Sequence, residues 1–356
     1  MSPSQEDRIR SGLIAAAVLL SACAGGTPAS KTWVDPLPGE RHLQHIRQLT
    51  FGGNNAEAYF SADGQWLVFQ RQPSLDAGCD QEYVMKIDGS HMRRISNGWG
   101  KTTCGYFYAN DTRVVYSSTF PHDSACPPPP DRSKGYTWAL NRYEIFTARR
   151  DGSDLRQLTN NGMYNAESTL SPDGKRIIFT STRDGDLELY TMNVDGTDVR
   201  RITHRVGYDG GAFFSPDGTK IVWRAGYPVT AADTADYLDL LAHRMVRPLR
   251  MELWVANADG SDAHQVTHLG GANFAPYFLP DGKRIIFASN WEDPRGRNFD
   301  LYVVNVDGSG LERITTSPEF DGFPMFNHDG TKLVWASNRH GTQTGETDLF
   351  IADWVN

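Results

Sequence analysis

The feature that most constrains this chain is a repeated unit, seen in its clearest form between Ala166 and Thr203. Within the unit, turn signals separate four short apolar runs. The first run ends at Pro172-Asp173-Gly174 and the third at Asp195-Gly196, where proline presets φ and glycine accepts a positive φ. Each unit therefore predicts four antiparallel strands, and such units repeated along a chain are typical of β-propeller blades.

The turn after the first run recurs along the chain, at Asp63-Gly64, Asp173-Gly174, Asp217-Gly218, Asp281-Gly282 and Asp329-Gly330, with a degraded copy at Asn110-Asp111. The last unit stops after its third run, Asp348–Asp353, whereas an orphan fourth run, Arg47–Thr50, stands before the first unit. We therefore expect the amino-terminal strand to complete the sixth blade and remove a free sheet edge. The sequence predicts an all-β fold, a six-bladed β-propeller closed by its amino-terminal strand.

The Ser-Pro-Asp-Gly turn and the downstream pattern Asp-Gly…Arg-x-(Ile/Leu)-Thr resemble the propeller repeat of the TolB family and of the propellers attached to some serine peptidases. The resemblance covers residues 46 to 354. It implies a TolB-like binding scaffold. TolB proteins also have an α/β domain ahead of the propeller, where a tether is expected here, so the resemblance does not imply a complete TolB role.

The amino terminus has the features of an export signal. Arg8 and Arg10 precede a short apolar run, Leu13–Leu20, which is too short to span a bilayer as a helix. Leu20-Ser21-Ala22-Cys23 resembles the bacterial lipobox, which implies lipid attachment at Cys23; the alternative is an ordinary cleaved signal. The same resemblance implies the outer membrane, because Ala24 follows the cysteine at the position where lipoproteins retained at the inner membrane carry aspartate.

The strand topology places all long insertions at one end of the propeller. The turns between the first and second strands and between the third and fourth strands lie at one face, the turn face, and the other connections lie at the opposite loop face. Thr234–Val246 predicts a short amphipathic helix there. Long loops on a rigid scaffold often form binding sites. The insertions at the loop face are 70–81, 120–142, 226–250, 291–298 and 339–347.

A set of polar residues is predicted to ring the channel mouth at the loop face. Most stand eight residues before a turn aspartate or its counterpart: Asn55, Thr103, Asn165, Asp209, Asn273 and Asp321. Glu57 and Glu167 stand two residues later and add carboxylates. Such an acidic collar would bind a peptide amine, a basic side chain, a polyol or a hydrated cation. The alternative is that the Asn and Asp side chains cap local turns.

Three cysteines besides Cys23 are predicted at the loop face: Cys79, Cys104 and Cys126. In an oxidising compartment two of them are expected to pair, with Cys104 bonded to Cys126 or to Cys79. Their spacing is not that of a metal site. No Gly-x-Ser-x-Gly, His-Glu-x-x-His or phosphate-loop motif is present, so we assign no catalytic residue, metal or cofactor.

These observations predict a signal peptide at 1–22, a flexible tether at 23–45 and the propeller at 46–356, on the periplasmic side of the outer membrane. The net charge of −8 argues against nucleic acid, whose phosphates need a basic surface. The sequence favours a non-catalytic, monomeric envelope lipoprotein that binds a protein or peptide partner through the loop face. Two alternatives stay open: an enzyme acting on polysaccharide or peptide, and a propeller that gates a separate hydrolase chain.

Overall fold

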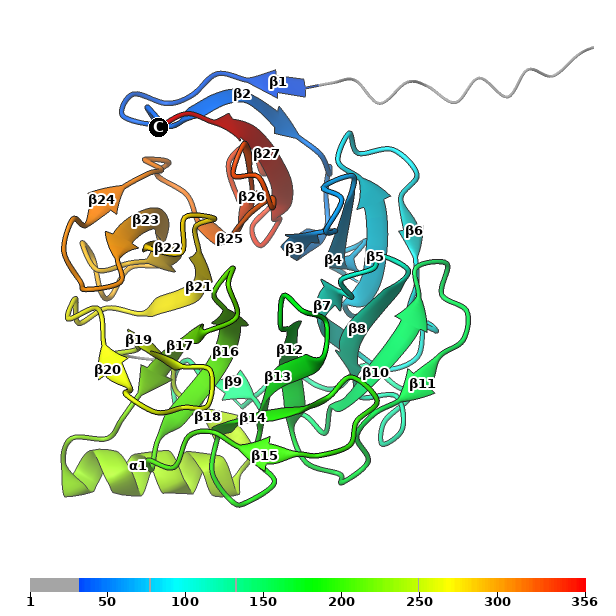
Figure 1. The fold of residues 1–356 in the computed structure, drawn as a ribbon, viewed down its shortest axis with the longest axis vertical. Helices are drawn as coiled ribbons and strands as arrows, with labels where there is room; N and C mark the ends of the chain where they lie inside the picture. The colour runs from blue at the N-terminus through cyan, green and yellow to red at the C-terminus, as the bar shows by residue number, and fades with distance from the viewer. Residues whose placement is uncertain (1–31, 77, 132, 249) are drawn as a thin grey trace, which may run out of the picture. The chain divides into compact units, whose positions relative to one another are not determined.

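The computed structural model of the protein describes residues 32–76, 78–131, 133–248 and 250–356. In this part of the chain, six sheets of four or five strands surround a central axis, and each sheet forms one blade (Figure 1). The first strand of each repeat lies innermost, and later strands lie progressively further out. The predicted six-bladed β-propeller is therefore confirmed.

Blades 1 to 3 each contain four strands in chain order. Blade 1 contains β3 (Asn54–Phe60), β4 (Trp66–Gln72), β5 (Gln81–Lys86) and β6 (Arg93–Arg94). Blade 2 contains β7 (Thr102–Phe107), β8 (Arg113–Ser118), β10 (Glu144–Arg149) and β11 (Arg156–Gln157). Blade 3 contains β12 (Asn165–Leu170), β13 (Arg176–Ser181), β14 (Glu188–Asn193) and β15 (Arg200–Arg201).

Blades 4 and 5 repeat this order, and blade 6 combines strands from both ends of the described chain. Blade 4 contains β16 (Tyr208–Phe214), β17 (Lys220–Gly226), β19 (Glu252–Asn257) and β20 (His264–Gln265). Blade 5 contains β21 (Asn273–Phe278), β22 (Arg284–Ser289), β23 (Asp300–Asn305) and β24 (Glu312–Arg313). Blade 6 contains β25 (Asp321–Phe326), β26 (Lys332–Ser337), β27 (Asp348–Trp354), β2 (Leu43–Gln48) and β1 (Thr32–Val34).

The second strand of each blade is packed on both of its faces. In β13, for example, Ile177, Ile178 and Phe179 are all 0% exposed. A run of consecutive apolar residues is expected where a strand is covered on both sides. Each such side chain stabilises the fold by roughly 1.5–3 kcal/mol relative to an exposed position, so these strands form the core of the blades.

The amino-terminal strand closes the ring, as predicted. β2 pairs antiparallel with β27, the last strand of the chain, in the register Arg47 with Ile351 and Gln48 with Phe350. The expected tether at 23–45 was wrong over its described part, because β1 adds a further strand to β2 and Leu43 is only 1% exposed. Its glycine- and proline-rich composition concealed two short strands. The expected signal peptide and Cys23 lie outside the described residues.

Two insertions at the loop face pair with each other. β9 (Trp138–Ala139) pairs antiparallel with β18 (Met245–Val246), which joins the long loops of blades 2 and 4. The predicted helix is α1 (Ala231–Ala242), displaced from the expected Thr234–Val246. It begins earlier because Thr230 and Asp233 form a reciprocal capping box at its amino end. No helix in the described part of the chain is long and apolar enough to cross a membrane.

The disulfide joins Cys79 to Cys126, with a Cα–Cα distance of 5.7 Å, and Cys104 is free. The expectation that Cys104 would bond to Cys126 or Cys79 was therefore wrong. Gly100, in the connection between β6 and β7, contacts the loops of both bonded cysteines: its N–H donates to Ser124 O (2.8 Å), and its carbonyl oxygen accepts from Gln81 Nε2 (2.8 Å). Cys104 lies instead on the innermost strand β7, which directs it toward the centre of the ring.

Candidate ligand-binding cavity

The centre of the propeller contains a cavity of about 1230 Å³ that is lined by the innermost strands and by the loop-face insertions. All five predicted insertions contribute lining residues, as the strand topology implies. Pro127–Pro130 and Arg295–Arg297 are examples from two of these loops. The volume exceeds the range of about 300–1,000 Å³ that is usual for small-molecule pockets.

Each innermost strand is interrupted by a β-bulge, and one residue at each bulge has a positive φ. These six residues are Glu57, Cys104, Glu167, Gly211, Ala275 and Phe323, with φ between 50° and 64°. All six line the cavity. A bulge re-aims a side chain, so each blade directs one residue into the cavity at an equivalent level.

The bulge positions could have been found more completely from the sequence. Glu57 and Glu167 were predicted as site residues, and both line the cavity. Gly211, Ala275 and Phe323 stand at the same distance before their turns but were missed because they are not polar. Cys104 was missed because Asn110, and not Asp111, is the counterpart of the turn aspartate in blade 2, as the hydrogen bond from Thr112 N to Asn110 Oδ1 shows. For the same reason, Thr103 lines the cavity and Thr102 occupies the buried position.

The remaining residues of the predicted collar do not line the cavity: Asn55, Asn165, Asp209, Asn273 and Asp321 are each 0% exposed. The three asparagines connect neighbouring blades, because each side-chain amide donates to an acidic residue that begins the third strand of the preceding blade. These pairs are Asn55 with Asp348, Asn165 with Glu144 and Asn273 with Glu252, at 3.1–3.2 Å. The prediction that these residues form a ligand-binding collar was wrong, since their polar atoms are used between the blades.

The two aspartates of the predicted collar occupy the same place but accept hydrogen bonds from tryptophan. Asp209 Oδ1 accepts from Trp223 Nε1 and from Tyr227 Oη, both at 2.6 Å. Asp321 Oδ1 accepts from Trp335 Nε1 at 3.1 Å. In both blades the tryptophan lies on the second strand, so the aspartate joins two strands of its own sheet.

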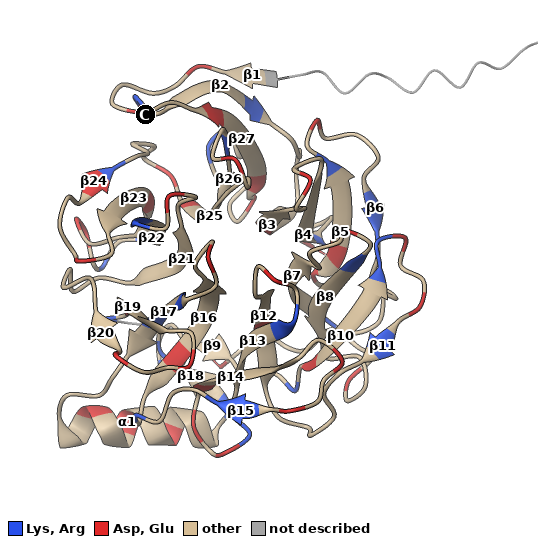
Figure 2. Ribbon diagram, in the orientation of Figure 1, with Lys and Arg blue, Asp and Glu red and all other residues tan. Residues whose placement is uncertain are grey.

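Asp209 and Asp321 stand where the other blades have asparagine. In these two cases the acidic residue that begins the third strand of the preceding blade pairs with an arginine instead of accepting from an asparagine amide. Arg201 donates to Glu188 at 2.5 Å, and Arg313 donates to Asp300 at 2.6 Å. Both arginines belong to short outermost strands, whose charged residues are coloured in Figure 2. At these two blade junctions an arginine therefore supplies the positive charge that two adjacent buried carboxylates need.

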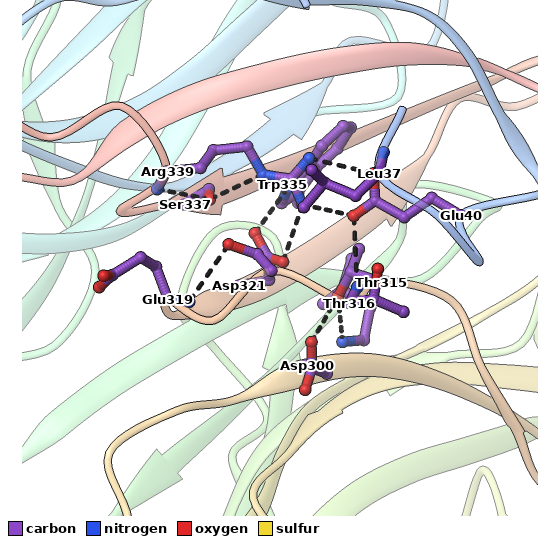
Figure 3. Close-up of polar contacts among 12 residues, drawn as sticks. Leu37, Glu40, Asp300, Thr315, Thr316, Glu319, Asp321, Trp335, Ser337 and Arg339 are labelled. Carbon is purple, nitrogen blue, oxygen red and sulfur yellow. Dashed lines mark hydrogen bonds and ion pairs between the residues drawn. The ribbon is translucent and has the colours of Figure 1, made fainter. Parts of the chain in front are cut away.

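Asp321 belongs to a buried ion-pair network that also holds the amino-terminal segment (Figure 3). Arg339 Nη2 donates to Asp321 Oδ2 at 2.9 Å and to Glu40 Oε1 at 2.8 Å. Glu40 lies in the connection between β1 and β2 and also accepts from the backbone of Thr316 in blade 5 at 3.3 Å. The network therefore ties the closing strands to blades 5 and 6.

The polar wall of the cavity is organised around Arg224, from the second strand of blade 4. Its guanidinium forms an ion pair with Glu167 and lies 5.4 Å from the ring centres of both Trp138 and Tyr208. Gly211 makes this position possible, because a Cβ there would collide with the guanidinium. The arrangement fixes a positive charge in the wall of the cavity.

Glu57 and Cys104 lie on the adjoining part of the wall. Burial raises the pKa of Glu57 to about 7, although a hydrogen bond with the Cys104 thiol acts in the opposite direction. Burial and the carboxylates of Glu57 and Glu167 raise the pKa of the Cys104 thiol well above its usual value. A thiol that stays protonated is a weak nucleophile. Among the described residues, no three His, Cys, Asp or Glu side chains are grouped so as to hold a metal ion.

Asp209 provides a test of the role between blades. Burial raises its pKa from 3.8 to about 8. Because the folded-state pKa is the higher one, its contribution to stability is complete below about pH 4 and is lost as the pH rises through 8. We expect Asp209→Asn to raise the free energy of unfolding at pH 8 by about 1–3 kcal/mol and to change it little at pH 4, as measured by urea denaturation.

The physical reason is that an amide keeps the oxygen acceptor and adds a donor. The new donor would face Glu188 Oε2, a buried atom without a hydrogen-bond partner among the described residues. The precedent is the junction between blades 2 and 3, where the side-chain amide of Asn165 donates to Glu144. The matched control is Asp321→Asn, which should destabilise because it removes the charge that balances Arg339. A loss of stability in Asp209→Asn at pH 8 would contradict this account.

Comparison with known proteins agrees with the geometry. A family model described as the TolB beta propeller domain matches residues 138–231 and 239–345. The structure of a putative TolB from Agrobacterium tumefaciens is similar, with 18% identity, a TM-score of 0.56 and coverage of 85% of this chain and 91% of that chain. No match was found among curated proteins.

Two other similar structures belong to different kinds of protein. An oligogalacturonate lyase from Vibrio parahaemolyticus has 12% identity, a TM-score of 0.52 and coverage of 86% of this chain and 93% of that chain. A chain of a nidogen/laminin complex has 12% identity, a TM-score of 0.51 and coverage of 74% and 80%. At such identities these structures show the fold alone. The matched family model covers more than half of the chain, and the chain belongs to the TolB β-propeller family.

Proposed function

We propose that this protein is a non-catalytic lipoprotein of the cell envelope that binds a segment of a partner protein in the cavity at its loop face. The observation that carries the proposal is the cavity itself, about 1230 Å³ and walled by all five insertions. A rigid ring with long loops at one end is a common arrangement for a binding site. Similarity to the putative TolB and to a chain of a protein–protein complex supports the same class of function.

The proposed location rests on the lipobox-like residues that end at Cys23, which implies an anchor on the periplasmic side of the outer membrane. We expect Cys23→Ser to move the protein from the membrane pellet to the soluble fraction, or to block its processing. Unchanged fractionation and processing would contradict the anchor. The binding proposal does not depend on this result, because the cavity is formed by the propeller alone.

The binding proposal is tested by affinity capture from detergent-solubilised envelopes with a variant whose cavity is partly filled. Ala275→Phe is suitable because the equivalent bulge of blade 6 already holds Phe323, so the position accepts an aromatic side chain. We expect this variant to lose most of the captured partner, since the added ring occupies the volume that the partner segment needs. The measurement is quantitative mass spectrometry of the captured proteins.

The matched control is Val199→Phe, which adds a similar apolar area at an exposed position outside the cavity. This control should capture the partner as the parent does. Equal capture by Ala275→Phe and Val199→Phe would overturn the cavity as the binding site. Cleavage of an oligogalacturonide or peptide by the purified parent would overturn the non-catalytic function.

A further inference from the structure

The charge of the cavity wall is opposite to that of the whole chain. The chain has a net charge of −8, yet the ionisable residues that line the cavity include more cations than carboxylates. The cations are Lys101, Arg224, Arg250, Arg295 and Arg297, and the carboxylates are Glu57 and Glu167. A concave surface lined by one sign of charge concentrates ligands of the opposite sign, so this wall favours an anion.

Several of these cations are not neutralised by the protein. Arg295 and Arg297 are exposed and have no hydrogen bond or ion pair among the described residues. Arg224 is paired with Glu167, but its Nε is buried without a hydrogen-bond partner in the described structure. Lys101 has a partner outside the cavity, Asp80 at 3.1 Å. The wall therefore holds two free guanidinium groups at a loop and a third that is only partly satisfied.

The remaining carboxylates weaken this positive field only in part. Glu167 is already committed to Arg224 and to the backbone N–H of Gly211 (2.9 Å). Burial raises the pKa of Glu57 to about 7, so a substantial fraction of this group is uncharged at neutral pH. Neither carboxylate provides the free negative charge that a basic ligand would require.

Another part of the wall is apolar and contains four phenylalanines in mutual contact. Phe274 has its ring centre 5.1 Å from that of Phe299 and 5.3 Å from that of Phe323. Phe320 completes the group, with its ring centre 5.8 Å from that of Phe299. All four line the cavity, and none has a polar side-chain atom. An apolar side chain gains from burial here, whereas sugar hydroxyls would lose hydrogen bonds with water.

We infer that the cavity binds an acidic peptide segment in which a carboxylate stands near an apolar side chain. The carboxylate binds among Arg224, Arg295 and Arg297, and the apolar side chain packs against the four phenylalanines. Guanidinium groups suit this role because their planar N–H donors match the geometry of a carboxylate. This inference rests on the proposed function and names the chemistry of the partner segment, which is opposite in charge to that expected from the sequence.

The test is a selection from a phage-displayed library of random heptapeptides against the immobilised propeller. We expect enrichment of peptides that carry Asp or Glu near Leu, Ile or Phe. The enriched peptide is then measured by fluorescence polarisation against the parent and against Arg295→Gln/Arg297→Gln. The double variant should bind at least about tenfold more weakly, and binding to the parent should weaken as ionic strength rises.

Arg224 is substituted together with Glu167, because removal of Arg224 alone would leave the buried Glu167 carboxylate without a cation. Arg224→Gln/Glu167→Gln removes both charges and should bind the acidic peptide more weakly, whereas Glu167→Gln alone frees the guanidinium and should bind it more tightly. The matched control is Arg156→Gln/Arg200→Gln, which removes the same charge as the Arg295 and Arg297 substitutions at exposed positions outside the cavity. This control should bind as the parent does.

Selection of Lys- or Arg-rich peptides, or of none, would overturn the inference. So would equal affinity of the parent and Arg295→Gln/Arg297→Gln, or binding of an oligogalacturonide in the cavity without any acidic peptide. These results are distinct from failure of the proposed function. A partner that is captured by the parent, lost with Ala275→Phe and unaffected by the arginine substitutions would keep the cavity as the binding site and reject the acidic ligand.

Discussion

A mature chain that begins at residue 51, and so lacks β1 and β2, should fail to form a stable propeller. β2 is the strand that joins the amino-terminal part of the chain to β27. Its removal exposes the edge of β27 and loses the burial of Leu43, Ile46 and Leu49, which are at most 5% exposed. These three side chains alone represent roughly 5–9 kcal/mol, comparable with the whole stability of a typical protein of about 5–15 kcal/mol.

Circular dichroism during heating and size-exclusion chromatography provide the measurement. The truncated chain should aggregate, or melt without a cooperative transition, because an open sheet edge pairs readily with other chains. The matched control is a chain that begins at Thr32 and keeps both strands, which should give a cooperative transition. If the chain from residue 51 melted within a few degrees of that control, β2 would not be the element that closes the ring.

The second large effect is expected from Arg339→Ala. Arg339 is 5% exposed and balances two buried carboxylates, Asp321 and Glu40 (Figure 3). Without the guanidinium both carboxylates stay buried and uncompensated, and we expect a loss of about 3–5 kcal/mol in the free energy of unfolding. Urea denaturation at pH 8 gives the value.

The pH dependence of this loss follows from burial, which raises the pKa of Asp321 even with Arg339 present. Protonated carboxyl groups need no cation, so the loss should be smaller at pH 4 than at pH 8. Arg200→Ala is the control, because Arg200 pairs with Asp198 at the exposed end of a blade and should leave stability unchanged. A loss that is the same at both pH values would indicate that packing of the arginine side chain, rather than charge, explains the effect.

The fold could be predicted because its information is local and repeated. Asp-Gly turns such as Asp173-Gly174 mark strand ends wherever they occur, and the orphan run Arg47–Thr50 identifies the closing strand without reference to side-chain contacts. β1 could not be predicted in this way. It is three residues long and pairs only with another short strand, so its stability depends on a neighbour that is already in place.

The site was harder to predict because periodicity does not determine where a side chain points. Asn165 and Glu167 stand two residues apart and would share a face in a regular strand, but the bulge places one between blades and the other in the cavity. Net charge gives no information about the cavity, since a value for the whole chain does not show that Arg295 and Arg297 both line it. Arg224 gives no sequence signal, because only the fold places it across Gly211.

The central claim is that the partner binds in the cavity at the loop face, and hydrogen–deuterium exchange of the captured complex tests it most directly. Backbone amides in the lining loops at 136–141 and 295–297 should exchange more slowly with the partner bound, because binding removes them from water. The turns at Asp195-Gly196 and Asp307-Gly308, on the turn face, should exchange at the same rate with and without the partner. Slower exchange confined to these Asp-Gly turns, with the lining loops unchanged, would contradict the account.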